Sequence, residues 1–178
     1  MKAFIWLLIF FTGFSLFAQE EQALVPVNPE TGLIQFREVV KVEGTKEELF
    51  NRCIYWLNGY YKNPTRVTTI RDVQSGRIEG THNIRLYYMN EGVKTPAGTV
   101  DYVFKIELKP NKYRYTISNL KLRSKTRMPI EKWLDKDDPE YNEHWDEYLQ
   151  QIADFVEGWS KNLQEKMKPE VAKTEDDW

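Results

Sequence analysis

The region from Thr45 to Tyr61 has the clearest pattern of apolar and polar positions in the chain. Its apolar residues recur three and four positions apart, as they do on one face of an α-helix. They are Leu49, Phe50, Cys53, Ile54, Trp56, Leu57, Tyr60 and Tyr61. Thr45 and Glu48 have the spacing of a capping box, which satisfies backbone N–H groups at a helix start. A helix is therefore predicted here, ending before Asn63 and Pro64, and its apolar face needs a second layer to pack against.

Other segments alternate with the period of two that is typical of half-buried strands. They span residues 34–42, 66–73, 77–89, 99–108 and 112–122. The short polar segment 74–76 predicts a hairpin turn. A change in the parity of the apolar positions within the last segment indicates a bulge near Ser118 and Asn119. Residues 90–98 contain two glycines and a proline, and we expect them to form a mobile loop.

A second, longer helix is predicted from Asp138 and Pro139, because Asp caps helices and Pro favours the first helical position. Its apolar positions keep helical spacing as far as Leu163. The order of elements is strand, helix, four strands and long helix. It predicts an α+β fold in which an antiparallel sheet of about five strands grips one or both helices.

The first nineteen residues are predicted to be a signal peptide. Lys2 precedes an apolar run over residues 3–17, and Ala18 and Gln19 form a plausible cleavage zone. The apolar run is shorter than the roughly 20 residues of a spanning helix, so cleavage is favoured over the alternative of an uncleaved membrane anchor. We therefore expect a periplasmic or secreted protein of a Gram-negative-type bacterium, without a stable membrane anchor after cleavage.

The remaining chain divides into a polar leader at 20–32, one α+β domain at 33–167 and a charged tail at 168–178. The formal net charge of −2 argues against a general nucleic-acid binder, which needs many uncompensated cations. Cys53 is the one cysteine of the chain, so no internal disulfide can form. Its place on the apolar face of the first helix predicts a small buried side chain.

The strand at 34–44, the helix at 46–61, the hairpin at 72–84 and the strand pair at 102–122 together resemble a known family. It consists of exported bacterial proteins with a domain of unknown function and a TATA-binding-protein-like fold. The resemblance lies in the pattern of these segments and does not extend to the second helix. It implies a TATA-binding-protein-like fold for this chain and carries no activity to transfer.

Lys121, Arg123, Lys125 and Arg127 alternate two apart, which places four positive charges along one edge of an extended chain. One interpretation is a docking strip for an anionic partner, such as a phosphorylated lipid headgroup or an acidic polymer. The favoured alternative is an edge strand that its charges protect against aggregation.

Several aromatic residues fall on the predicted inner faces of strands and helices. Tyr88, Tyr102, Tyr115 and Trp159 are the candidates for the lining of an apolar pocket between the sheet and the long helix. Filling of the core by the same side chains is the preferred interpretation.

Neither histidine is predicted to have enough neighbouring ligands for a metal site. His144 stands among carboxylates, but zinc needs three or four ligands, so a side chain on the solvated helix face is favoured. His82 shares the parity of Ile84 and is expected in the core or lining a cavity. The acidic run 135–138 lacks the spacing of a calcium loop, and a helix cap is the better interpretation.

No nucleophile motif or phosphate-binding glycine pattern is present, and no catalytic residue, cofactor or metal is expected. The sequence therefore favours a non-catalytic envelope module that binds an unknown small ligand or an envelope protein. The alternatives are a carboxylate-dependent hydrolase, using residues such as Glu38 or Asp101, and a structural subunit of an envelope assembly.

Overall fold

The computed structural model describes residues 23–124 and 126–169. In these two ranges the strands form one antiparallel sheet in the order β1-β5-β4-β3-β2, and a short strand, β6, pairs with β5. The strands are β1 (Phe36–Lys41), β2 (Thr68–Asp72), β3 (Arg77–Asn90), β4 (Val93–Lys109), β5 (Lys112–Leu122) and β6 (Met128–Pro129). The predicted signal peptide at 1–19, part of the leader, Lys125 and most of the charged tail lie outside the described residues.

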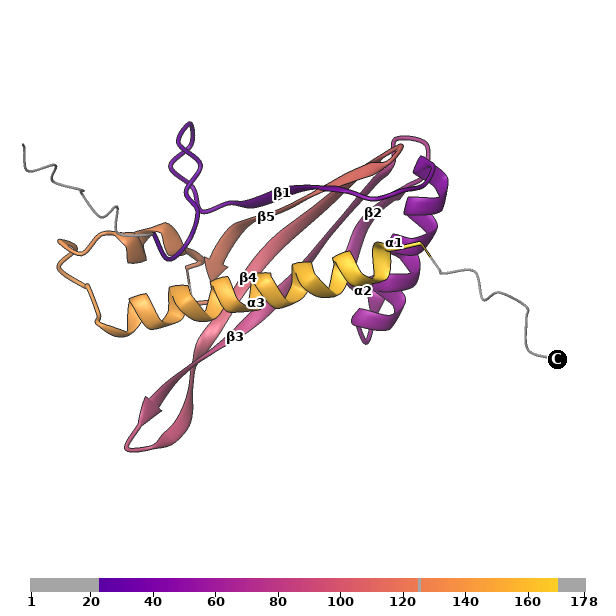
Figure 1. Cartoon of the computed structure of the whole chain (residues 1–178). Coiled ribbons are helices and arrows are strands. Elements are labelled where there is room, and N and C mark those ends of the chain that lie inside the picture. The colour runs from indigo at the N-terminus through magenta and orange to yellow at the C-terminus, as the bar shows by residue number, and fades with distance from the viewer. Residues whose placement is uncertain (1–22, 125, 170–178) are drawn as a thin grey trace, which may run out of the picture.

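The two long helices cover one face of this sheet (Figure 1). The first, α1 (Lys46–Tyr60), has the predicted capping box, in which Thr45 N–H donates to Glu48 at 2.7 Å and Glu48 N–H donates to Thr45 at 3.2 Å. The second, α3 (His144–Met167), lies across the sheet and packs beside α1. The α+β class predicted from the order of elements is confirmed. No described helix is long and apolar enough to cross a membrane.

The chain between α1 and β2 differs from the predicted strand at 66–73. Residues Pro64–Val67 form one helical turn, α2, and the strand begins only at Thr68. Pro64 occupies the start of this turn, where its fixed φ suits a helix and its missing N–H has no consequence. The polar alternation of residues 66–73 therefore gave no sign of the helical turn that precedes the strand.

The predicted mobile loop at 90–98 is wrong, because these residues continue the hairpin of β3 and β4. The turn is only Glu91 and Gly92, which both have positive φ values of 48° and 81°, as a tight hairpin turn requires. Pro96 is accommodated by a bulge in β4, where the register shifts between Leu86 and Tyr87 of the partner strand. The hairpin extends well beyond the body of the molecule (Figure 1).

The long helix begins six residues after its predicted start. The Asp138 side chain accepts a hydrogen bond from Glu140 N–H, and its carbonyl accepts one from Tyr141, so it closes a local turn instead of capping a helix. Asn142 accepts from His144 N–H at 2.9 Å where α3 starts. The irregular segment before α3 includes a short 3₁₀ helix, Ile130–Leu134.

The bulge predicted near Ser118 and Asn119 is confirmed. Val103 pairs with Ser118 while Asp101 pairs with Lys121, and Asn119 adopts a positive φ of 56°. The extra residue turns Leu120 into the core and leaves Lys121 on the opposite face beside Asp101. This bulge therefore determines where the basic side chains after it point.

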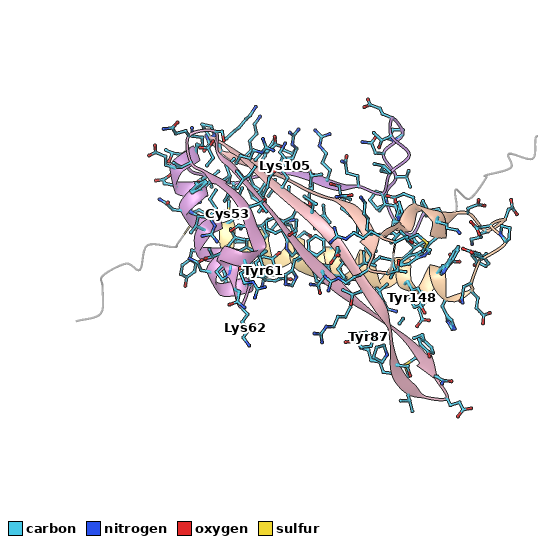
Figure 2. All side chains as sticks on the ribbon, turned by 180° about the vertical axis from the view of Figure 1, so that it is seen from behind. Cys53, Tyr61, Lys62, Tyr87, Lys105 and Tyr148 are labelled. Carbon is cyan, nitrogen blue, oxygen red and sulfur yellow. The ribbon has the colours of Figure 1, made fainter. Side chains whose placement is uncertain are left out.

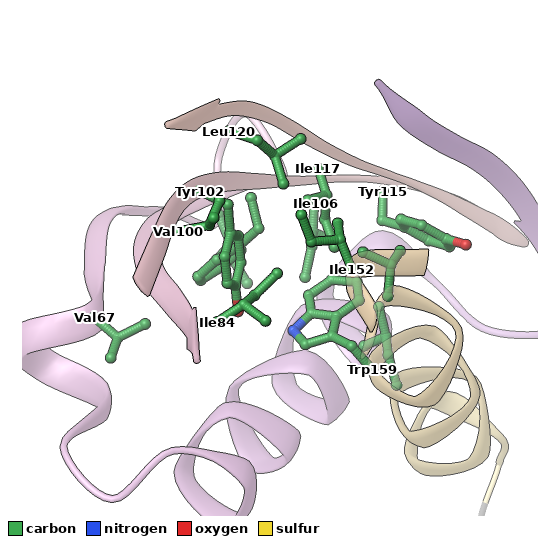
Figure 3. Packing of buried hydrophobic residues seen from close by; sticks show 14 of the residues in the cluster. Val67, Ile84, Val100, Tyr102, Ile106, Tyr115, Ile117, Leu120, Ile152 and Trp159 are labelled. Atoms are coloured by element: carbon green, nitrogen blue, oxygen red, sulfur yellow. The ribbon is translucent and has the colours of Figure 1, made fainter. Parts of the chain in front are cut away.

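Aromatic and aliphatic side chains fill the space between the helices and the sheet (Figure 3). Trp159 lies at the centre, in ring contact with Trp56 and Tyr115. Cys53 is fully buried in the same core, and burial raises the pKa of its thiol. The prediction of a buried, unreactive cysteine on the packing face of α1 agrees with this position.

Candidate functional site

A hollow of about 500 Å³ lies at the edge of the sheet where β2 begins, and it is the best candidate for a binding site. Its wall comes from the α2 segment, from the middle of β3 and β4, and from the end of β5 with the residues that follow. The volume falls within the range of small-ligand pockets. Its lining is mostly polar and includes the amides of Asn63, Asn83 and Asn119.

Five cationic side chains line this hollow against one carboxylate, that of Asp101. They are Lys62, Arg66, Lys121, Arg123 and Arg127. Arg123 is paired with Asp101, and this partner raises the pKa of the guanidinium. Within the described ranges the other four cations have no carboxylate partner. The hollow therefore has an excess of unpaired positive charge, which favours an anion.

The position of the α2 segment depends on Gly80. This glycine lies in β3 opposite Phe104 of β4, and a Cβ placed on it would stand 2.4 Å from the carbonyl oxygen of Val67. Only a glycine allows the chain of α2 to approach the strand so closely. Arg66 belongs to α2 and Lys62 lies two residues before it, and Figure 2 shows Lys62 beyond the end of α1.

His82 forms part of the floor of the hollow, on the side toward the core. Its ring lies 5.0 Å from the ring of Tyr61 and 6.3 Å from that of Tyr102. Burial lowers the pKa of His82, with a smaller opposing effect from a hydrogen bond with the Asn83 backbone. Tyr61 and Tyr102 stay protonated, because burial raises the pKa of Tyr61 to about 12 and that of Tyr102 further.

The structure brings together part of the basic strip and adds two cations that the sequence did not suggest. Lys121, Arg123 and Arg127 all line the hollow, whereas Lys125 is outside the described residues. Lys62 and Arg66 join them from a segment about sixty positions away. Their only signal in the sequence was Pro64, which marked the helical turn that carries them.

The structure places the four aromatic residues proposed as a pocket lining in two different regions. Tyr102, Tyr115 and Trp159 are 1%, 6% and 0% exposed and belong to the packed core. Tyr88 lies farther along β3, where its ring is 5.5 Å from that of His144. Of the four, Tyr102 alone reaches the cationic hollow. Tyr102, Tyr115 and Trp159 are part of the side-chain packing between the sheet and the long helix.

The two carboxylates considered for hydrolysis have separate structural contacts. Glu38 accepts hydrogen bonds from the Tyr115 hydroxyl at 2.7 Å and from Gln164 at 3.2 Å, and it does not line the hollow that contains Asp101. His144 is half-buried and lies 3.5 Å from Glu147. In the described parts of the chain, no three His, Cys, Asp or Glu side chains form a group that could hold a metal ion.

Two other concave surfaces have a smaller excess of positive charge. A hollow of about 340 Å³ on the open face of the sheet contains Glu107, which pairs with Lys105 and Arg114. A groove of about 520 Å³ between α1 and α3 is lined by aromatic and amide groups with Lys166 as its cation. The hollow beside α2 is distinguished from both by the number of its unpaired cations, which are Lys62, Arg66, Lys121 and Arg127.

The antiparallel sheet with α1 and α3 on one face defines an α+β protein with a TATA-binding-protein-like (TBP-like) fold. Residues 36–123, from the start of β1 to the end of β5, match the model of DUF4468, a domain of unknown function with TBP-like fold. The chain carries a domain of this family, so the resemblance seen in the sequence is confirmed. The long helix α3 lies outside the matched residues.

Two solved structures have the same fold. One is a TBP-like protein from Parabacteroides distasonis, with 15% identity and a TM-score of 0.65. The match covers 81% of this chain and 97% of that protein. The other is a DUF4468 family protein from Bacteroides ovatus, with 12% identity and a TM-score of 0.67. That match covers 85% of this chain and 95% of the other protein. No curated protein matches the chain.

Proposed function

We propose that the protein is a non-catalytic binding module of the cell envelope whose ligand site is the cationic hollow beside α2. The observation that carries this proposal is the convergence of Lys62 and Arg66 with Lys121, Arg123 and Arg127 around one hollow. Charges that only protect a strand edge need not meet cations from a distant segment. The ligand is an anionic group, held by charge-assisted hydrogen bonds.

The place of action rests on the sequence of residues 1–19, whose charged start, apolar run and cleavage zone are those of a secretory signal peptide. We infer a periplasmic or secreted location for the mature protein. The absence of a paired nucleophile and base around the hollow favours binding over catalysis. The single carboxylate there, Asp101, already pairs with Arg123.

Calorimetric titration with inorganic tripolyphosphate tests this proposal. Replacing Lys62 and Lys121 together by Gln should weaken binding about tenfold or more, because each removes a charged hydrogen-bond donor. The matched control replaces Lys109 and Lys112 by Gln. These two residues lie opposite each other in the strand register, at the other end of β4 and β5, and they lie outside the hollow.

The control variant should bind like the unchanged protein, and binding should weaken with added salt. Equal losses in the two double variants would mean that tripolyphosphate responds to the overall charge and not to the hollow. Failure of the unchanged protein to bind would remove the basis of the proposal.

Affinity for an anion of constant charge, such as inositol hexasulfate, should rise as the pH falls from 7.5 to 5. Burial keeps the pKa of His82 below its ordinary value, so the ring is neutral at pH 7 and adds a positive charge to the hollow only at lower pH. We expect a rise of about two- to fivefold, the range of an exposed charge pair. His82→Gln should abolish it.

Both proteins in this comparison should carry Asn in place of Asp101, which removes the carboxylate of the hollow. A pH dependence that persists unchanged in the His82→Gln protein would exclude His82 as its origin.

A further inference from the structure

The middle of β3 has a free edge beside the hollow. On that side β2 pairs only with Arg77–Gly80, because the chain enters β2 from α2 at Thr68. In the described chain no strand lies beyond Gly80 on this edge, although β3 continues to Asn90. Thr81 and Arg85 are exposed and Asn83 is half-buried. An open edge of this kind offers unpaired backbone groups to another strand.

The far end of this edge shows which backbone groups point outward. The side chain of Gln151, from α3, accepts a hydrogen bond from Tyr87 N–H at 3.0 Å and donates one to Tyr87 C=O at 2.7 Å. The amide thus pairs with Tyr87 as a neighbouring strand would. Figure 2 shows Tyr87 where the hairpin leaves the body.

Backbone groups alternate between the two sides of a strand. Because Tyr87 faces away from β4, the N–H and C=O groups of Thr81, Asn83 and Arg85 face the same free edge. Those of His82 and Ile84, at the alternate positions of the strand, face β4. The free edge is therefore limited by Gln151 at one end and by β2 at the other, with a slot between them.

The charge around this slot selects its occupant. Thr81 and Asn83 line the hollow together with the five cations, and Arg85 adds another positive charge on the same strand. A second copy of this edge would bring like charges together, which opposes pairing. An extended segment with carboxylates on alternate residues meets both the free backbone groups and the cations.

We propose that the free edge of β3 from Thr81 to Arg85 accepts an extended acidic polypeptide segment as an added strand, with its carboxylates in the cationic hollow. This proposal rests on the proposed function, since it uses the same hollow and names the partner. The backbone of the segment supplies strand hydrogen bonds, and its acidic side chains supply the selectivity.

Hydrogen exchange measured by NMR on the ¹⁵N-labelled protein tests the proposal amide by amide. The probe is a capped peptide of alternating Glu and Thr, about nine residues long, which is enough to span the edge. Its binding should slow exchange at Thr81, Asn83 and Arg85 about tenfold or more. Exchange at His82 and Ile84 should stay as it was, because the alternation along the strand turns their N–H groups toward β4.

Three comparisons isolate the causes. The same peptide with every backbone amide N-methylated keeps its charge but loses its donors, and it should bind about tenfold more weakly. A peptide of alternating Lys and Thr should not bind. Replacing Lys62 and Lys121 by Gln should weaken the acidic peptide, whereas the Lys109 and Lys112 double variant should not.

Inorganic tripolyphosphate distinguishes the two proposals. If it binds while the acidic peptide and its N-methylated form bind equally and protect none of the three amides, the hollow is an anion site and the strand proposal is wrong. If neither tripolyphosphate nor peptide binds, both proposals fail. Equal binding of the basic peptide would overturn the role given to charge.

Discussion

Replacing Trp159 by Ala is expected to lower the free energy of unfolding by about 3–5 kcal/mol, the usual cost of removing a buried large aromatic side chain. The ring has no exposed surface. It contacts the rings of Trp56 on α1 and Phe104 on β4, at centroid distances of 5.1 and 6.0 Å respectively. The Trp159 side chain, which belongs to α3, thus packs against both α1 and the sheet. Urea denaturation, followed by circular dichroism, measures the loss.

Packing and hydrogen bonding at this position can be separated. Trp159 Nε1 donates to the Tyr61 hydroxyl at 2.8 Å, and that oxygen lies 3.3 Å from the hydroxyl of Tyr102. Trp159→Phe keeps much of the apolar contact and removes the donor, so we expect a smaller loss of about 1–3 kcal/mol. A loss as large as that of the Ala variant would contradict the importance of packing.

A control on the same pair of helices is Tyr55→Ala. Tyr55 is 72% exposed on α1, and its removal should change the free energy of unfolding by about 0.5 kcal/mol or less.

Elements with a complete local signal could be predicted from the sequence. The capping box of Thr45 and Glu48 and the apolar periodicity after it define α1 without reference to other elements. The change of parity around Asn119 revealed a bulge, because one extra residue reverses every following side chain. Such signals depend only on residues that are close in the sequence, so they can be recognised without knowledge of tertiary contacts.

The errors occurred where turn chemistry has several outcomes. Pro96 and two glycines suggested a loop, but a bulge lets a proline stay within β4 when its missing N–H is not needed by the partner strand. Asp138 and Pro139 suggested a helix start, and Asp138 instead closes a turn before Asn142. The residue types alone do not distinguish these alternatives.

The site was only half visible in the sequence. Lys121, Arg123 and Arg127 stand in one segment, so their spacing was apparent. Lys62 and Arg66 join them through the close approach of α2 to β3. That contact depends on tertiary packing at Gly80, and the periodicity of apolar residues in the sequence gives no information about it. The open edge of β3 was hidden for the same reason, since it exists because β2 starts late.

Replacing Gly80 by Ala is expected to lower the free energy of unfolding by about 1–3 kcal/mol. The added Cβ would stand 2.4 Å from both the Val67 carbonyl oxygen and the Phe104 ring. The carbonyl belongs to the backbone and cannot rotate aside, so α2 has to move away from β3. The matched control is Gly158→Ala on α3, where nothing lies within 4 Å of the new Cβ.

The control should raise stability by about 0.5–1 kcal/mol, because alanine favours a helix over glycine, and should leave anion binding unchanged. Gly80→Ala should also weaken tripolyphosphate binding, although it alters no charge, because moving α2 separates Arg66 and Lys62 from Lys121 and Arg123. Calorimetry on the folded variant measures this effect. Lower stability with unchanged affinity would show that Lys62 and Arg66 do not act together with Lys121 and Arg123. The predicted combination of both losses would connect one close backbone contact to the geometry of the whole site.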